Sequence, residues 1–300
     1  MEPGVTIELS GGLGNQMFQY AAAAGLARKH KVPVYATLAD NPRPYYLDKL
    51  ACRKEIKLCR PSLLGRLTNR PGLFDLQAKQ YNQPGFHYDP SFEQLKPPIY
   101  LRGYFQSWRY LTYLQWQKRE QLEADFAPVS PPSVETLEYL RRIKAAHFPV
   151  IVQVRLGDYE LPEKRAYHGI LSVEYYVHAL WLIKRLWDFR PDVFLVSDEP
   201  ERANAHWGVD PLNQCSVPVQ LKSLCNSWTV IDKVPDFEQL TLLMPVAKAY
   251  VIANSSFGWW GAWLNPRSDK TVIAPRQWFS PETLRKNNTC DLYPPGWITL

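Results

Sequence analysis

Arg155, Gly157 and Asp158 are the residues whose types and spacing point most directly to chemistry. They follow an almost unbroken run of β-branched residues that begins at Val150. Such a run predicts a buried parallel strand, which delivers the polar residues after it to the edge of a sheet. A guanidinium there can hold a phosphate through two hydrogen bonds, a glycine permits close approach, and an aspartate can orient the arginine. The alternative interpretation is a structural Arg–Asp pair that closes a loop.

Two acidic residues end a second apolar run in the same way. Ser197, Asp198 and Glu199 close a predicted strand that starts at Asp192. Side chains at this point of a Rossmann-like unit commonly contact the ribose or base of a nucleotide. Because the acids are adjacent, rather than spaced as in a metal-binding Asp-x-Asp, we predict nucleotide contacts. A metal site and a helix cap are the alternatives.

A third polar group opens an aromatic helix. Asn254, Ser255, Ser256 and Phe257 follow an apolar run that ends at Ala253. Their amide, hydroxyls and helix-start N–H groups can bind a phosphate or a sugar. The tryptophans that follow are expected to pack the helix into its domain.

A glycine-rich turn near the N-terminus resembles part of a dinucleotide-binding fingerprint. It includes Gly14, Asn15 and Gln16, and it joins a predicted strand, 5–9, to a helix predicted over 17–29. The N–H groups at such a helix start attract phosphate. The last glycine of G-x-G-x-x-G is a methionine here and the downstream acid falls late, which disfavours a nicotinamide-dependent oxidoreductase. A plain tight turn is the other interpretation.

Strands alternate with helices in both halves of the chain, which predicts an α/β protein with two doubly wound, Rossmann-like domains. Further strands are expected at 32–38, 98–105, 230–231, 250–253 and 271–274, and further helices over 110–124, 133–146, 172–187, 200–206 and 236–248. Pro245 should bend the last helix. Three prolines in the segment 127–132 interrupt the pattern. We therefore predict an N-terminal domain over 1–130 and a C-terminal domain over 131–300.

Composition and charge narrow the classes of ligand. The formal net charge of +6 favours an anionic partner, but the basic residues are dispersed, which favours a small phosphorylated ligand over nucleic acid. The five cysteines show no C-x-x-C and no histidine at metal spacing, so we predict neither a metal site nor disulfides. The chain shows no membrane-spanning run and no signal peptide, which predicts a cytoplasmic protein. Eleven tryptophans leave a non-catalytic glycan-binding protein as an alternative.

Three longer blocks resemble the signature blocks of the α-1,2-fucosyltransferase family, which is glycosyltransferase family 11. These blocks are Gly11–Ala21, Arg155–Tyr159 and Ile252–Leu264. Shorter matching pieces occur in the family's order, namely Gly103–Ser107, His168-Gly169, Tyr175-Tyr176, Asp236-Phe237, Ala274-Pro275 and Trp278-Phe279. The resemblance therefore covers nearly the whole chain.

This resemblance implies a GT-B-like fold, in which two Rossmann-like domains face a central cleft. The N-terminal domain would lie on the acceptor side and the C-terminal domain would bind the nucleotide sugar. The implied reaction is metal-independent, inverting transfer of L-fucose from GDP-fucose to the 2-hydroxyl of a terminal galactose, as in O-antigen synthesis. GDP-fucose would be a co-substrate and no cofactor is implied. A peripheral membrane association through a lipid-linked glycan acceptor is a further alternative.

The resemblance also implies roles for individual residues. Arg155 matches the family's essential arginine, which is expected to hold the donor diphosphate. The other residues assigned to donor binding are Gly14, Asn15, Gln16, Gln153, Ser197, Asp198, Glu199, Asn254, Ser255, Ser256 and Phe257. A general base should take the acceptor proton, and its candidates are Asp158, Glu160 and His168.

Two positions depart from the family's usual His-x-Arg-Arg-Gly-Asp motif. Gln153 replaces the histidine and Leu156 replaces the second arginine, while Glu199 stands where a second aspartate is commoner. Because the histidine position and the acidic pair at 198–199 help read guanine in related fucosyltransferases, transfer from another GDP-deoxysugar is the alternative function. The acceptor, the general base and the role of the basic segment 49–71 stay open at this point.

Overall fold

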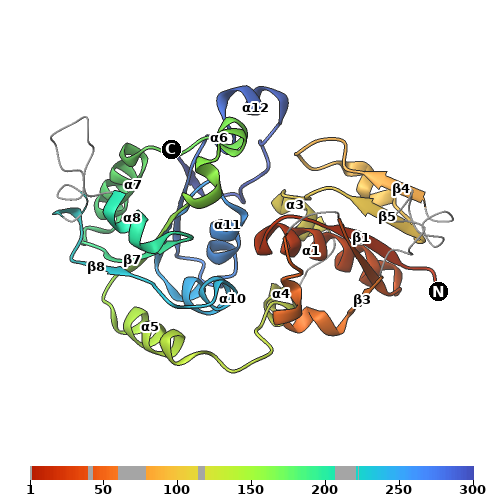
Figure 1. Ribbon diagram of the computed structural model, residues 1–300, viewed down its shortest axis with the longest axis horizontal. Coiled ribbons are helices and arrows are strands. Elements are labelled where there is room, and N and C mark those ends of the chain that lie inside the picture. Colours follow the sequence, from red (N-terminus) through yellow and green to blue (C-terminus); the bar gives the residue numbers. More distant parts are fainter. Residues whose placement is uncertain (1, 40–42, 60–78, 114–118, 207–220, 222) are drawn as a thin grey trace. The chain divides into compact units, whose positions relative to one another are not determined.

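The computed structural model describes residues 2–39, 43–59, 79–113, 119–206, 221 and 223–300. The chain divides into two compact units (Figure 1). Unit 1 contains Met1–Ser130 and Asn287–Pro294, and unit 2 contains Pro131–Lys286 and Pro295–Leu300. Whereas the sequence predicts all of 131–300 as one domain, Asn287–Pro294 packs with unit 1, where Asp291 Oδ2 accepts a hydrogen bond of 2.8 Å from the Tyr88 N–H.

Unit 1 contains a parallel sheet whose described strands have the order β3-β2-β1-β5-β4. The strands are β1 (Val5–Leu9), β2 (Val34–Leu38), β3 (Ile56–Leu58), β4 (Lys79–Asn82) and β5 (Ile99–Arg102). The helices are α1 (Leu13–His30), α3 (Trp108–Tyr113) and α4 (Arg119–Asp125), with the 3₁₀ turns η1 (Leu47–Lys49), η2 (Ala51–Lys54) and η3 (Pro90–Gln94). Helix α1 buries an alanine-rich stretch around Ala21–Ala24, which permits close packing on the sheet.

The N-terminal glycine turn is shorter than predicted, because α1 begins at Leu13 rather than at Met17. Gly12 is the N-cap, and the N–H groups of Asn15 and Gln16 donate to its carbonyl at 3.0 Å. The two outer strands β3 and β4 were not predicted, because short edge strands with exposed polar residues lack an apolar run. Part of the segment 49–71 lies outside the described residues.

Unit 2 contains a second parallel sheet, with the order β11-β10-β9-β6-β7-β8 among its described strands. The strands are β6 (Pro149–Val154), β7 (Asp192–Ser197), β8 (Ser227–Val230), β9 (Ala249–Val251), β10 (Thr271–Ala274) and β11 (Ile298–Thr299). The helices are α5 (Val134–Ala145), α6 (Pro162–His168), α7 (Val173–Trp187), α8 (Pro200–His206), α10 (Asp236–Glu238), α11 (Ser256–Trp263) and α12 (Pro281–Lys286). The turns are η4 (Gly157–Glu160), η5 (Gln239–Leu243) and η6 (Met244–Val246).

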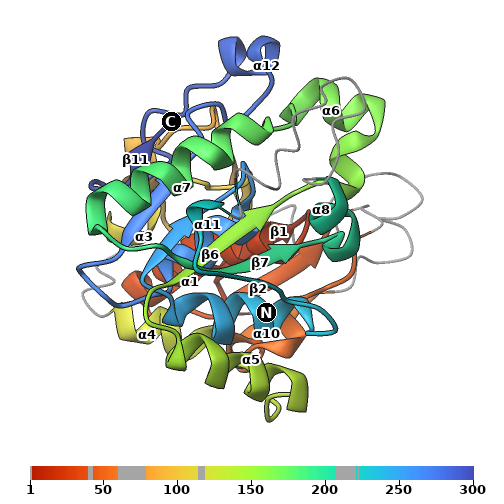
Figure 2. The ribbon, with the colours of Figure 1, turned by 90° about the vertical axis from the view of Figure 1, so that its left-hand side faces the viewer.

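The two central strands of this sheet are buried along their whole length. All six residues of β6 and all six of β7 are buried, as the continuous apolar runs predict. Helix α7 lies beside β6 (Figure 2), and its buried residues Tyr176, Leu180 and Ile183 share one hydrophobic core with Val152 and Val154. Because side chains alternate along a strand, Ile151 and Gln153 point to the opposite face.

Three local predictions in unit 2 were wrong. The segment after Asp158, where no helix was predicted, contains the turn η4 and the helix α6, which has no buried residue. The helix predicted over 236–248 is short, because α10 passes into the π-helical turn η5 and then into the 3₁₀ turn η6 that contains Pro245. Strand β8 begins at Ser227 rather than at Val230. Among the described residues, no helix is long and apolar enough to cross a membrane.

A buried glutamate ties the start of α5 to α10. Glu238 is 4% exposed, and its Oε2 accepts hydrogen bonds from the Ser133 N–H at 3.0 Å, the Ser133 hydroxyl at 2.7 Å and the Thr136 hydroxyl at 2.5 Å. Burial opposes the charge, but these hydrogen bonds lower the pKa of Glu238 below its usual value. Ser133 is the N-cap of α5, since its hydroxyl accepts a 3.3 Å hydrogen bond from the Thr136 N–H, and it also anchors the chain just after the boundary between the units.

We expect Glu238→Ala to lower the free energy of unfolding by about 2–4 kcal/mol at pH 7, because three donors lose a buried acceptor. Since the folded-state pKa is lowered, this stabilisation is present above the ordinary glutamate pKa and is lost as the pH falls through the folded-state value. Urea titrations of both proteins at pH 7 and pH 4 measure it.

Glu138→Ala is the matched control, because Glu138 is an exposed glutamate of α5 whose partner is Arg141 at 2.8 Å. Its cost should be about 0.5 kcal/mol or less. Equal costs for the two variants would contradict the role assigned to Glu238.

Candidate functional site

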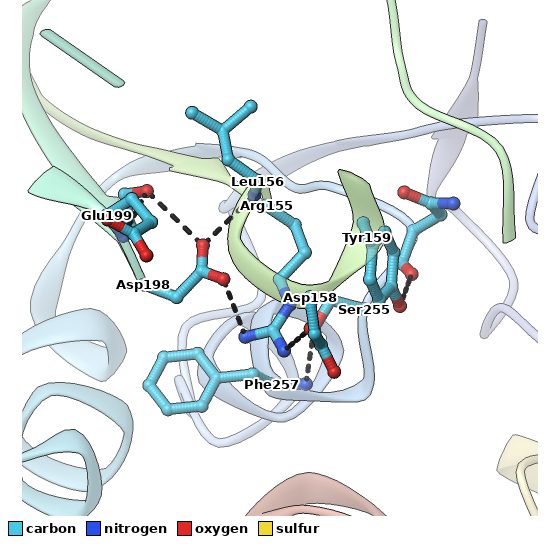
Figure 3. A network of polar contacts seen from close by, with 10 residues as sticks. Arg155, Leu156, Asp158, Tyr159, Asp198, Glu199, Ser255 and Phe257 are labelled. Atoms are coloured by element: carbon cyan, nitrogen blue, oxygen red, sulfur yellow. Dashed lines mark hydrogen bonds and ion pairs between the residues drawn. The ribbon is translucent and has the colours of Figure 1, made fainter. Parts of the chain in front are cut away.

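The polar residues predicted from three separate strands gather at one edge of the unit 2 sheet. Arg155 follows β6, Asp198 follows β7, and Ser255 follows β9 by a short turn. Because β6, β7 and β9 are parallel neighbours, their carboxyl ends meet at this edge. Figure 3 shows the guanidinium of Arg155 between Asp158 and Asp198, pointing toward the start of α11, where Ser255 and Phe257 lie.

Arg155 forms two ion pairs. Its Nη2 lies 2.5 Å from Asp158 Oδ1, and its Nη1 lies 3.3 Å from Asp198 Oδ2. The three side chains are only 24%, 25% and 21% exposed. Burial opposes the positive charge, but Asp198 and Asp158 raise the pKa of Arg155 above its usual value. The guanidinium also lies over the ring of Tyr159, with its carbon 5.2 Å from the ring centroid.

Gly157 allows the ends of β6 and β7 to approach each other. Its φ is +20°, and a Cβ at this position would collide with Asp198 Oδ2. The other carboxylate oxygen of Asp198 accepts a 3.1 Å hydrogen bond from the Leu156 N–H. Next to it, the Ser197 hydroxyl accepts a 3.1 Å hydrogen bond from the Glu199 N–H. Asp198 is therefore fixed by the backbone as well as by Arg155.

The turn into α11 is organised by two buried polar side chains. The Ser255 hydroxyl caps the helix by accepting a 3.3 Å hydrogen bond from the Phe257 N–H. Asn254 is 3% exposed, and its Nδ2 donates to the carbonyls of His168 at 3.0 Å and Trp278 at 3.2 Å. Asn254 thus holds three segments of unit 2 together beneath the site, and Ser256 is the first residue of the helix.

His168 lies in an aromatic stack. Its ring is parallel to that of Tyr159, at an interplanar angle of 5° and a centroid distance of 4.4 Å, and it lies 6.3 Å from the ring of Phe279. The Tyr159 hydroxyl donates a 3.0 Å hydrogen bond to the Asn254 carbonyl. Burial, with a contribution from Lys164, lowers the pKa of His168 to about 4. The imidazole is therefore neutral near pH 7.

The three predicted general bases have different surroundings. Asp158 pairs with Arg155, and Glu160 Oε2 lies 2.5 Å from Arg202 Nη2 at a more exposed position. His168 is in its basic form at neutral pH, but its low pKa makes it a weak proton acceptor. Asp236, the first residue of α10, is not among the site residues predicted from the sequence. Desolvation raises its pKa, Arg155 opposes that shift, and Asp198 adds to it.

The sequence did offer one indication of Asp236, because Asp236-Phe237 is one of the short pieces that resemble the α-1,2-fucosyltransferase family. Its electrostatic coupling to Arg155 and Asp198 follows only from the packing of α10. Within the part of the chain that the structure describes, no group of three or more His, Cys, Asp or Glu side chains is arranged to hold a metal ion.

The two residues that depart from the resembled motif are buried. Leu156 is 3% exposed and belongs to the hydrophobic core that includes Tyr176. Gln153 is also 3% exposed, and its Oε1 accepts a 3.0 Å hydrogen bond from the Ala253 N–H beside Gly258 of α11. A leucine at 156 therefore suits an apolar environment, and Gln153 connects β6 to the turn before α11.

The predicted residues of the glycine-rich turn belong to unit 1. Asn15 Oδ1 accepts a 2.7 Å hydrogen bond from Gln106 Nε2. Gln16 is 2% exposed, and its amide bonds to the backbone of Gly11, Pro44 and Tyr46 at 2.9–3.0 Å. Gly14 lies in the first turn of α1. Gln16 thus holds the connection after β2 against the start of this helix.

Comparisons with known proteins place these features in context. No family model matches the chain. The chain is 28% identical over 312 residues to an alpha-1,2-colitosyltransferase of Escherichia coli, covering 99% of this chain and 98% of the relative. It is also 28% identical over 321 residues to the O-antigen biosynthesis glycosyltransferase WbnK of Escherichia coli, covering 97% and 99%. A structure of mutant Arabidopsis thaliana FUT1 in complex with GDP aligns with a TM-score of 0.50 and 15% identity, covering 93% of this chain and 72% of that one.

The architecture and the structural likeness confirm the predicted α/β, GT-B-like fold with two Rossmann-like units. The full-length likeness to two glycosyltransferases supports the broader expectation that this chain is a glycosyltransferase. The donor, acceptor and linkage belong to the proposal below.

We expect the free energy of unfolding of His168→Phe to fall less than that of the wild type when the pH is lowered. Because the folded-state pKa of His168 is lowered to about 4, the unfolded chain binds more protons between pH 6.5 and pH 4, and stability falls as the pH falls through this range. The wild-type protein should lose about 1–3 kcal/mol more than the variant between pH 7 and pH 4.5. Urea titrations at both pH values measure the difference.

His147→Phe is a control at another histidine that contacts a phenylalanine ring, that of Phe189. It measures what replacement of a histidine by phenylalanine does to the free energy of unfolding at both pH values when the stack of His168 on Tyr159 is left intact. Identical pH dependence in wild type and His168→Phe would show that burial of His168 does not shift its titration.

Proposed function

We propose that the chain is an inverting glycosyltransferase that moves L-fucose from GDP-fucose to the 2-hydroxyl of a terminal galactose, forming an α-1,2 linkage without a metal ion. The observation that carries the proposal is the position of Arg155, a largely buried guanidinium at the carboxyl end of a central parallel strand. A diphosphate leaving group needs positive charge at such a site. The start of α11 adds backbone N–H groups and the positive end of a helix dipole.

The proposed reaction is a single displacement. The oxygen of the acceptor hydroxyl attacks the anomeric carbon, the bond from that carbon to the phosphate oxygen breaks, and GDP leaves with the electron pair. The hydroxyl proton passes to a base, and attack opposite the leaving group inverts the configuration. Arg155 stabilises the charge that grows on the leaving phosphate, an effect on the order of several kcal/mol in comparable sites.

The polar groups around Arg155 have supporting roles in this proposal. Asp198 holds Arg155 at the end of β7, while Ser197 and Glu199 present polar groups to the nucleoside. Ser255, Ser256 and Phe257 supply the helix start. Asn254 and Gln153 position that turn from below, since both are buried and bonded to backbone groups. The resemblance also assigns the unit 1 residues Gly14, Asn15 and Gln16 to donor binding.

A second donor, GDP-colitose, has its own support. The name of the first relative assigns an α-1,2 linkage and colitose to that protein. Colitose is 3-deoxy-L-fucose, so the two donors share the nucleotide, the diphosphate and the anomeric centre. The same site chemistry serves either one.

A screen of both donors decides between them. GDP-fucose, GDP-colitose and GDP-mannose are each tested with lactose, N-acetyllactosamine and Gal-β-1,3-GalNAc, and products are identified by mass and linkage analysis. We expect α-1,2 transfer of one 6-deoxy sugar and no transfer from GDP-mannose. NADH binding without any transfer would instead favour an oxidoreductase, and glycan binding without hydrolysis or transfer would favour a non-catalytic binding protein.

Arg155→Lys should lower kcat about 100-fold or more, because lysine keeps the charge but cannot donate two parallel hydrogen bonds to phosphate. Initial rates at saturating donor measure the change, and an unchanged melting temperature shows that the fold persists.

Arg202→Lys is the matched control, because Arg202 is a 51% exposed arginine paired with Glu160 at the edge of the same site. It should change kcat by about threefold or less. Near-normal turnover of a folded Arg155→Lys protein would overturn the role of Arg155 as phosphate clamp.

EDTA should leave the rate unchanged, because Arg155 and the helix start supply the positive charge in this proposal. The measurement compares initial rates before and after dialysis against EDTA. Loss of activity that Mn²⁺ restores would assign a metal to the carboxylates of Asp198 and Glu199.

A further inference from the structure

The guanidinium of Arg155 is only partly satisfied. Its Nη1 contacts Asp198 and its Nη2 contacts Asp158, while its Nε is buried and has no hydrogen-bond partner among the residues that the structure describes. Nε and Nη2 form one edge of the planar group, and this edge can grip two oxygens of a single anion. Asp158 therefore fills half of a two-pronged anion site and leaves a buried donor open beside it.

Of the two aspartates that contact Arg155, Asp198 is held more firmly than Asp158. Asp198 directly follows the fully buried strand β7, and its second carboxylate oxygen accepts the Leu156 N–H. Asp158 lies in η4, a single turn that begins at Gly157. The segment continues into α6, which buries no residue, and ends at Gly169, where φ is +73°. Tyr159 anchors the turn η4 itself, but α6 has no buried residue and φ is positive at both ends of the segment, which makes Asp158 the easier carboxylate to move.

The charge of the site also favours displacement of one carboxylate when a diphosphate binds. Arg155 contributes one positive charge to its contacts with Asp158 and Asp198, which contribute two negative charges, so this group of three carries one net negative charge. The electrostatic coupling of Asp236 to Arg155 and Asp198 adds another acid nearby. A diphosphate that entered without displacing an acid would meet repulsion in a poorly solvated site.

We propose that Asp158 is an internal anion that occupies the diphosphate subsite when no donor is bound, and that donor phosphoryl oxygens displace it from the Nε–Nη2 edge of Arg155. Asp198 stays on Nη1 and keeps the guanidinium in place as a positioning residue. No covalent bond changes in this exchange, because one anion replaces another on the same donors. The inference rests on the proposed function, since it takes a nucleoside diphosphate as the ligand.

Binding of GDP and of inorganic pyrophosphate by calorimetry tests the exchange. Asp158→Asn keeps the shape of the side chain and removes the competing charge, so it should bind GDP about 3–10-fold more tightly than the wild type. Asp198→Asn should bind GDP about 10-fold more weakly, because it loses the anchor of Arg155. If Asp158→Asn fails to fold by melting temperature, Asp158→Ala replaces it in the same measurement.

Glu160→Gln is the matched control for charge. It removes one negative charge from the same turn but leaves both contacts of Arg155 intact, since Glu160 pairs with Arg202. GDP affinity should then change by about twofold or less. Equal tightening by Glu160→Gln and Asp158→Asn would reduce the effect to general electrostatics and overturn the exchange.

A double-variant cycle separates exchange from simple structural support. In an Arg155→Lys background the two-pronged edge is gone, so Asp158→Asn should lose most of its effect on GDP affinity. In the wild-type background it should lower the KM for the donor. Weaker GDP binding by Asp158→Asn, or the same change in both backgrounds, would show that Asp158 orients Arg155 rather than blocking the anion site.

The outcomes also separate this inference from the proposed function. If the wild-type protein binds neither GDP nor any nucleotide sugar, the proposed function fails. The exchange is then supported only if Asp158→Asn binds pyrophosphate where the wild type does not, and it is overturned if both fail to bind. If the wild type binds GDP and Asp158→Asn does not bind it more tightly, the exchange alone is overturned.

Discussion

The placement of one largely buried guanidinium between two carboxylates is the constraint on which the site in unit 2 depends. Removing a charged arginine from water is costly unless anions and hydrogen bonds compensate, and Asp158 and Asp198 provide that compensation at 2.5 and 3.3 Å. The compensation is incomplete, because Nε has no hydrogen-bond partner in the described part of the chain. A site built in this way is stable without ligand and still has a donor available for an incoming anion.

The sheet beneath the arginine makes this arrangement rigid. Strands β6 and β7 are buried along their full length, so the residues that follow them have little freedom at the sheet edge. Gly157 lets the turn pass close to Asp198, where any larger residue would collide. Asp198 is thus held by the backbone of Leu156 as well as by Arg155, whereas Asp158 lies in the turn that leads into α6.

The surroundings of Leu156 and Gln153 explain why these residues can replace those of the His-x-Arg-Arg-Gly-Asp motif. Leu156 packs in the hydrophobic core and Gln153 bonds to the Ala253 N–H, so both contribute to the support of the site. Because Leu156 stands where the motif has its second arginine, Arg155 is the arginine that this motif places at the end of β6. The group that occupies the Nε–Nη2 edge of Arg155 is therefore more important. The aromatic stack of Tyr159, His168 and Phe279 supports the other side of the turn.

The sequence by itself determined the α/β class, the central strands and the residues at their carboxyl ends. Continuous β-branched runs are buried wherever they occur, and parallel strands necessarily bring Arg155 and Asp198 to one edge. Edge strands such as β3 and β4 escaped prediction, because short, partly exposed segments carry no such run. Only the tertiary structure decided which nitrogen of Arg155 meets which carboxylate, that His168 is stacked and neutral, and that Asp236 is coupled to the site. These features depend on contacts between segments distant in sequence, which local patterns do not encode.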